Sequence, residues 1–327
     1  MADKIPALLA KIEAENKIKI LFAVESGSRV WGMDSPDSDF DIRGIFISTD
    51  PIARNNVFLK SDRSITIDGF TEDRVYDWVF WDVTTFLRLV KNNNPTAIDW
   101  MLSDICYTGE EELLKVRQLF LEKCDLNYYL VHHYGLIKSM YEKFVNPDRM
   151  TKRSLDSRNF LQGVKNIHQS LDVLVESHSH KADNVINSIS KRLADLKTII
   201  ATEYPPDEGK SLTKIKKILY ACRSAISIEY MLQKGQIPPL DVTAGFDQIE
   251  VDFDRSQFKD ILQLKRRTKE LEDCMCPDWL TSWYQKLCKI MVKKCIEIKT
   301  SKKIDVSDEV YVRYYLECSE NYPLKTL

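Results

Sequence analysis

The sequence lacks the features that would place it in a membrane or in an oxidising compartment. It has no apolar stretch long enough to cross a bilayer (about 20 residues). Its start, MADKIPALLAKIEAENK, carries charges instead of the apolar core of a signal peptide. None of the eight cysteines stands in a CxxC pair, which argues against a zinc site of that kind. We therefore expect no membrane span, a cytoplasmic location and free thiols.

The sequence also lacks a large net charge of either sign. Lysine plus arginine number 47 and aspartate plus glutamate 49, so the net charge is −2. This balance excludes a globally cationic surface, and a bound nucleic acid would need a local basic patch. Because single cores stop growing at roughly 250–300 residues, a chain of 327 residues favours two domains.

The hydrophobic pattern divides the chain into a mixed block and a helical block. A helix is predicted over residues 5–15 and another from Asp82, where the period changes. Strands are predicted over 18–24, 40–48, 65–67 and 75–80. After residue 110 the pattern is almost entirely helical, over 110–122, 126–145, 151–175, 183–203, 211–234, 255–273, 279–298 and 307–320. The fold class is α+β, with a small mixed-sheet domain over 1–125 and an all-α domain over 126–327.

Two aspartates open the second predicted strand. Asp39 and Asp41 lie two positions apart, so both side chains project from one face while Phe40 and Ile42 turn to the core. Carboxylates this close repel each other unless a cation lies between them, and Mg²⁺ prefers such oxygens. The alternative is a solvated acidic turn, of which the preceding SPD forms part.

A small-residue turn precedes the aspartates. Gly27 allows close approach of an anion to the backbone, Ser28 offers a hydroxyl donor, and Arg29 adds a cation. Alone, this pair of residues is typical of any turn or helix cap. Beside a pair of carboxylates, it indicates a nucleoside triphosphate site.

Gly-Ser, ten residues and then DFDI is similar to the signature of the polymerase-β nucleotidyltransferase superfamily. The longer string ESGSRVWG…SPDSDFDIRGIF resembles the RNA repair pathway DNA polymerase β family, whose members are associated with an RNA ligase and an RNA end-healing kinase-phosphatase. The similarity extends through 76–107 and resumes over 212–242. It implies a polymerase-β-like catalytic domain with a helical domain closing the cleft.

The resemblance also implies roles for three carboxylates. Asp39 and Asp41 would bind two Mg²⁺ or Mn²⁺ ions. A third carboxylate on a later strand, best matched by Asp77, would join one ion and take the proton of the attacking hydroxyl. Asp73 and Asp82 are the alternatives, although Asp82 is better explained as a helix N-cap.

Basic residues gather at the start of a predicted helix. Lys216, Tyr220 and Arg223 share one helical face, with Lys217 beside them. In the resembling family this pattern would line the cleft opposite the aspartates and hold the triphosphate or the acceptor strand. The alternative is a solvated basic face.

Other conspicuous side chains have structural explanations. The aromatic residues Trp78, Phe80, Trp81 and Phe86 are expected to pack in the core. The histidines at 132, 133, 178 and 180 are not expected to bind metal, because no further ligand completes a set by spacing.

The resulting hypothesis is transfer of NMP from an NTP to an acceptor hydroxyl with release of pyrophosphate. Family association makes an RNA 3′ end or tRNA-like acceptor the first choice. Alternatives are nucleotidylation of a protein or a small molecule, a non-catalytic nucleotide-binding module, and a toxin–antitoxin type protein whose helical region binds a partner chain.

Overall fold

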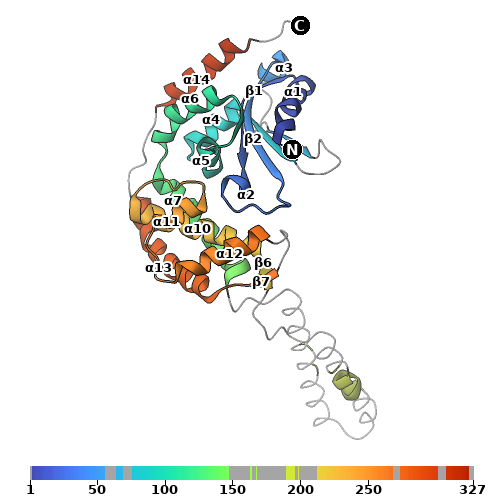
Figure 1. Ribbon diagram of the computed structural model, residues 1–327, viewed down its shortest axis with the longest axis vertical. Coiled ribbons are helices and arrows are strands. Elements are labelled where there is room, and N and C mark those ends of the chain that lie inside the picture. Colours follow the sequence, from blue (N-terminus) through green and yellow to red (C-terminus); the bar gives the residue numbers. More distant parts are fainter. Residues whose placement is uncertain are drawn as a thin grey trace.

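The computed structural model describes residues 2–55, 64–68, 76–146, 212–267, 273–300 and 307–323, together with a few positions between 163 and 198. Its first part is a five-stranded sheet flanked by helices, and its second part is a helical body (Figure 1). The predicted α+β class is confirmed. Within the described residues, no helix is both long and apolar enough to cross a membrane. All eight cysteines are free.

The sheet is mixed, as predicted. Its strands are β1 (Ile18–Ser26), β2 (Phe40–Ser48), β3 (Ser64–Asp68), β4 (Tyr76–Asp82) and β5 (Cys106–Thr108). They lie in the order β3-β4-β2-β1-β5, in which β2 and β4 are parallel and the other neighbours antiparallel. β5 was not predicted, because three residues are too few to show alternation.

The two faces of the sheet carry different residues. Trp78 and Phe80 are buried beneath α1 (Ile5–Asn16), whereas Val79 and Trp81 pack against the opposite face. That opposite face is covered by α4 (Val83–Lys91), α5 (Pro95–Leu102) and α6 (Glu110–Phe120). Because strand side chains alternate, Asp77 belongs to the face of α4 and α5.

Local capping explains where α4 begins. The carboxylate of Asp82 accepts a hydrogen bond of 2.9 Å from the backbone N–H of Thr84, which the first turn of a helix leaves unpaired. Asp82 is therefore the N-cap that the sequence predicts, and its role there is structural.

The helical body is built around α10 (Ile215–Lys234), most of whose side chains are buried. α7 (Leu126–Met140) with its π-helical continuation at Tyr141–Val145, and α11 (Val242–Asp247), α12 (Arg255–Arg267) and α13 (Asp278–Thr300) complete the body. The predicted helices over 151–175 and 183–203 lie outside the described residues, apart from isolated positions.

Two predicted helix boundaries are wrong. The helix predicted from residue 211 begins at Ile215, and the one predicted to reach 273 ends within the described residues at Arg267. Instead, β6 (Leu212–Lys214) pairs antiparallel with β7 (Asp273–Met275). A pairing between segments so far apart in the chain leaves no signal in local periodicity.

The sheet and the helical body share one continuous hydrophobic core. The last helix, α14 (Asp308–Asn321), returns to the first part of the chain, where the ring of Tyr311 stacks on Phe120 at 5.1 Å (Figure 1). α7 begins at Leu126, beside the predicted domain boundary, which itself stays a prediction.

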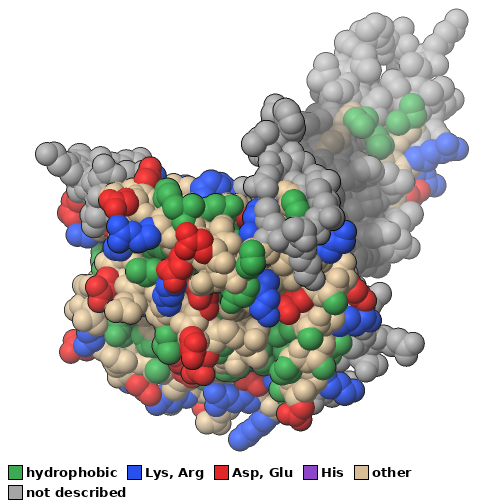
Figure 2. All heavy atoms as spheres, turned by 90° about the horizontal axis from the view of Figure 1, so that it is seen from above, with side chains coloured by type: hydrophobic (Ala, Val, Ile, Leu, Met, Phe, Trp, Pro, Cys, Tyr) green, Lys and Arg blue, Asp and Glu red, His purple; other side chains and the backbone are tan. Residues whose placement is uncertain are grey.

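The acidic and basic side chains are mixed over the surface seen in Figure 2, in keeping with their nearly equal numbers. On the end of the molecule seen in Figure 2, the acidic and basic side chains that are coloured lie interspersed with apolar and neutral ones. Any binding of a charged ligand on this face would therefore depend on local contacts rather than on a broad field of one sign.

Candidate active site

At the end of β1, the backbone of Gly27 lies against the carboxylate of Asp41. The register of β1 and β2 places Ser26 opposite Asp41. The next residue, Gly27, has φ +68°, and a Cβ built on it would lie 2.0 Å from Oδ2 of Asp41. No side chain fits in that space, so glycine is required both for the turn and for the close approach.

Asp41 and Asp77 are neighbours across the parallel pair β2–β4. Nη2 of Arg43 lies 2.8 Å from Oδ1 of Asp41 and 2.7 Å from Oδ2 of Asp77. Because one nitrogen contacts both oxygens, these oxygens are no farther apart than the two distances combined. The structure thus brings together two of the predicted carboxylates, on the same face of the sheet.

Arg43 is held in place by the backbone as well. Its Nη1 donates to the carbonyl oxygens of Asp77 at 2.8 Å and of Ile42 at 3.1 Å. Sequence reasoning missed this residue, although the alternation that put Asp41 on one face of the strand places Arg43 on the same face. Arg43 therefore supplies a fixed positive charge to the two carboxylates.

The environment of Asp41 disfavours its charged form. Burial raises its pKa to about 6, the guanidinium of Arg43 opposes that rise, and the charges of Asp39 and Asp77 add to it. The Lys216 amine lowers the same pKa. Lys216, on α10, thus acts electrostatically on the carboxylate cluster of the sheet, as expected for two sides of one cleft.

The carboxylates partly fit a divalent cation. Asp41 and Asp77 offer closely spaced oxygens of the kind that Mg²⁺ prefers, and Asp39, which directly precedes β2, adds charge beside them. Within the described residues, however, no group of three or more acidic, histidine or cysteine side chains converges on one point. The position between Asp41 and Asp77 is taken by Arg43.

Glu25 contacts this carboxylate cluster, and the sequence analysis did not predict it as a site residue either. It is fully buried, accepts a hydrogen bond of 3.0 Å from the backbone N–H of Asp41, and accepts another from the hydroxyl of Tyr107. Burial raises the pKa of Glu25 to about 7, while the hydrogen bonds from Tyr107 and Asp41 oppose the rise. An acidic residue two positions before Gly27 was the available sequence signal.

Replacing Glu25 with glutamine tests this description. Since burial raises the pKa from 4.5 to about 7, the unfolded chain loses its proton first and stability falls as pH rises through that window. Glutamine does not titrate; its Oε1 can accept from the backbone N–H of Asp41, and its Nε2 can donate to the hydroxyl oxygen of Tyr107, which reverses that hydrogen bond. We expect urea denaturation to show Glu25→Gln about 3 kcal/mol more stable than wild type at pH 8, and close to wild type below pH 4.5. A difference that does not vary with pH would contradict the assignment.

Ser28 and Arg29 follow Gly27 in the short helix α2 (Gly27–Val30). Ser28 is buried. The guanidinium of Arg29 donates to the carbonyl oxygens of Ser38 and Asp39, at 2.5 and 2.9 Å, and lies 4.0 Å from the centroid of the Phe40 ring. These contacts favour a role for Arg29 in holding the loop before β2. The phosphate contacts predicted for Ser28 and Arg29 stay predictions.

A pocket of about 480 Å³ lies between the sheet and the helical body. It is lined from the sheet side by Gly27, Asp41 and Arg43, and from α10 by Tyr220 and Arg223. Its other walls come from α5, α7 and neighbouring positions: Ser26, Trp31, Pro95, Thr96, Asp99, Trp100, His132, His133 and Leu136. The structure thus brings two residues of the predicted basic surface into one pocket with Gly27 and Asp41, whereas Asp39, Asp77, Lys216 and Lys217 are not among its lining residues.

The basic residues of α10 differ in their surroundings. The amines of Lys216 and Lys217 lie 5.8 and 5.6 Å from the centroid of the Tyr220 ring. The guanidinium of Arg223 forms an ion pair of 2.6 Å with Asp99. Arg223 is therefore already neutralised, which argues against a phosphate contact, whereas Lys216 influences the carboxylates.

Three contacts fasten the loop between Gly27 and β2 to the helical body. The buried amine of Lys265 donates to the hydroxyl of Ser35 at 2.6 Å, and Arg266 donates to the carbonyl oxygen of Gly32 at 3.0 Å. The N–H of Val242 donates to the carbonyl oxygen of Trp31. The loop that leads to Asp39 is thereby held by α11 and α12.

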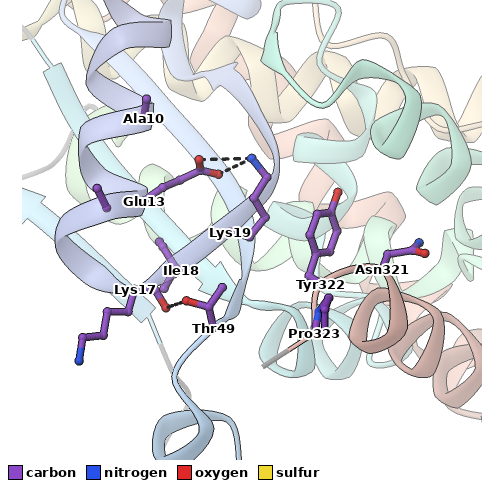
Figure 3. A pocket seen from close by; sticks show the side chains of 10 residues that line it. Ala10, Glu13, Lys17, Ile18, Lys19, Thr49, Asn321, Tyr322 and Pro323 are labelled. Carbon is purple, nitrogen blue, oxygen red and sulfur yellow. Dashed lines mark hydrogen bonds and ion pairs between the residues drawn. The ribbon is translucent and has the colours of Figure 1, made fainter. Parts of the chain in front are cut away.

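Another hollow, of about 430 Å³, lies between α1 and the residues after α14 (Figure 3). Its charged groups are paired, because the carboxylate of Glu13 meets the amine of Lys19 at 2.9 Å. The hydroxyl of Thr49 donates to the carbonyl oxygen of Lys17. Glu13 is the one acidic residue among those that line this hollow, and none of its lining residues lines the pocket described above.

The chain is similar to known proteins over nearly its whole length. The chain is 24% identical over 316 residues to the uncharacterized protein YcgL of Bacillus subtilis (strain 168), an alignment that covers 95% of this chain and 94% of YcgL. No solved structure matches significantly. Residues 1–313 match the model of a family described as the RNA repair pathway DNA polymerase beta family. The chain therefore belongs to the RNA repair pathway DNA polymerase beta family.

Proposed function

We propose that this protein transfers a nucleoside monophosphate from an NTP to an acceptor hydroxyl and releases pyrophosphate. The observation that carries the proposal is the contact between Gly27 and the Asp41 carboxylate, with Asp77 directly alongside. Bare backbone that can approach a phosphate and carboxylates that can hold a cation are the two parts such a reaction needs.

In this reaction the acceptor oxygen attacks the α-phosphorus, the bond from that phosphorus to the bridging oxygen of the β-phosphate breaks, and pyrophosphate leaves. Gly27 and Ser28 hold the terminal phosphates, and Asp77 takes the proton of the attacking hydroxyl. Asp39, Asp41 and Asp77 would hold Mg²⁺ or Mn²⁺, which neutralises phosphate charge and lowers the pKa of the hydroxyl. Most of the rate gain then comes from positioning and charge neutralisation.

The acceptor that we propose is the 3′ hydroxyl of an RNA. Membership of a family described by RNA repair supports this choice. The supporting charge is local, since the amines of Lys216 and Lys217 lie beside Tyr220 near the pocket. Phosphates of an RNA end need such a patch because the chain has no net positive charge.

One observation favours a non-catalytic nucleotide-binding module. Arg43 lies between Asp41 and Asp77, anchored by backbone carbonyls, where a transferase would bind a cation. In that case the protein would bind NTP without releasing pyrophosphate.

Incubation with labelled nucleotides separates these possibilities. Each of the four α-labelled NTPs is supplied with Mg²⁺ or Mn²⁺ and an RNA oligonucleotide ending in a 3′ hydroxyl. The same RNA ending in a 3′ phosphate serves as the matched control. We expect label to enter only the hydroxyl-ended RNA, with equimolar pyrophosphate. Parallel incubations supply DNA or a cell lysate as the acceptor, and nucleotide binding with no label on RNA, DNA or lysate protein would refute NMP transfer.

A further inference from the structure

Three residues that line the pocket carry buried polar atoms that the fold leaves without partners. Both ring nitrogens of His133 and Nε1 of Trp31 and Trp100 are buried and make no hydrogen bond to any described residue. All three side chains line the same pocket. Buried polar groups are almost always paired, so three such residues around one pocket indicate a ligand that completes them.

These atoms define what the ligand must offer. An indole N–H only donates, so Trp31 and Trp100 each need an acceptor. Burial and the neighbouring Arg223 keep the pKa of His133 well below its ordinary value. The His133 ring is therefore neutral, with one donor and one acceptor nitrogen. A matching ligand presents several acceptors and at least one donor.

The surrounding charges exclude an anionic group from this part of the pocket. Asp99 binds the guanidinium of Arg223 at 2.6 Å and the hydroxyl of Tyr129 at 2.6 Å. The Arg223 guanidinium also lies 4.1 Å from the centroid of the Trp31 ring. Its positive charge is thus already compensated, and a phosphate here would meet no uncommitted cation among the lining residues.

The walls are flat and aromatic. Trp31 and Tyr220 pack edge to face at 5.6 Å, and Trp100 stacks on Trp81 at 3.7 Å. A volume of about 480 Å³ falls within the range of small-molecule sites. A planar heterocycle fits such walls, and its edge supplies the mixture of acceptors and donors that the unpaired atoms require.

We propose that the part of the pocket lined by Trp31, Trp100 and His133, called the recess below, binds the nucleobase of the NTP. The proposal rests on the proposed function, because it assigns one end of the same nucleotide. The recess is continuous with Gly27 and Asp41, so one molecule places its phosphates at the sheet and its base between α5 and α7. Base selection is then made by Trp31, Trp100 and His133, not by the basic residues of α10.

Binding without turnover tests this assignment. Isothermal titration in Mg²⁺ gives the Kd of ATP, GTP, CTP and UTP, and of inorganic tripolyphosphate, which lacks a base. We expect wild type to prefer one or two of the four NTPs. His133→Leu and Trp100→Phe each remove hydrogen-bonding atoms, and we expect them to weaken the preferred NTP about tenfold or more while leaving tripolyphosphate unchanged.

A matched control is available on the sheet. Nε1 of Trp78 is also buried without a partner in the described part of the chain, but Trp78 lies in the core beneath α1. Trp78→Phe therefore removes an indole N–H that lies outside the recess. It should change neither the affinity for NTP nor that for tripolyphosphate. His133→Asn, which keeps one donor and one acceptor, should retain more affinity than His133→Leu.

The outcomes distinguish the subsite from the reaction. Equal weakening of NTP and tripolyphosphate would show a structural effect and overturn the proposal. Two other results would also overturn the proposal. One is an unchanged NTP affinity in both variants, as expected if the unpaired atoms bind only water. The other is no NTP binding by wild type. His133-dependent NTP binding without NMP transfer would keep the subsite and refute the proposed reaction. If the protein transfers NMP and His133→Leu leaves the base preference of that transfer unaltered, the proposed reaction is kept and the subsite is refuted.

Discussion

Replacing Asp41 with asparagine should lower NMP transfer by about 10³-fold or more at saturating NTP. Asp41 contacts the Gly27 backbone on one side and shares the Arg43 guanidinium with Asp77 on the other. Asparagine has nearly the same shape but no negative charge to hold a cation. The measurement is pyrophosphate release, which does not depend on knowing the acceptor in advance.

The fold should survive this change. The Asp41 pKa is raised because burial and the charges of Asp39 and Asp77 disfavour its ionised form. A neutral side chain removes that cost, so the melting temperature should stay near that of wild type. Asp34→Asn, in the same loop but outside the cluster, is the matched control and should keep full activity. Substantial activity in Asp41→Asn at saturating Mg²⁺ would refute the role of the carboxylate.

Gly27→Ala should reduce both activity and stability. The new Cβ would lie 2.0 Å from Oδ2 of Asp41, so either the carboxylate or the turn must move. Asp41 cannot easily yield, because Glu25 holds its backbone N–H and Arg43 holds its side chain. We expect kcat/KM to fall about 100-fold or more, and the free energy of unfolding to fall by about 2–4 kcal/mol.

Gly235→Ala separates the two contributions to this loss. Gly235 has φ +65°, almost the value of Gly27, but nothing lies within 4 Å of the position of its Cβ. It should therefore lose only the 1–2 kcal/mol or so of a left-handed alanine and keep full activity. If Gly27→Ala behaved like Gly235→Ala in both measurements, the contact between the turn and Asp41 would have no functional meaning.

Local patterns predicted the parts of the site that lie on regular strands. Alternation placed Asp41 with its side chain away from the core, and the parallel pairing then set Asp77 opposite it. The same alternation would have identified Arg43. Capping chemistry separated Asp82 from the site, as the hydrogen bond to Thr84 bears out.

Features made by distant segments could not be predicted in this way. The pairing of β6 with β7 joins residues about 60 positions apart, and the ion pair of Arg223 with Asp99 spans more than 120. Neither leaves a period in the local sequence. The buried, unpaired ring of His133 is likewise visible only once α5, α7 and α10 are packed together.

The most direct test is a crystal structure with Mg²⁺ and an NTP analogue that cannot be cleaved between the α- and β-phosphates. We expect triphosphate oxygens against the backbone of Gly27 and Ser28, and a metal ion bound by Asp41 and Asp77. A nucleotide bound elsewhere, or Arg43 still bridging the two carboxylates with no metal beside them, would contradict it.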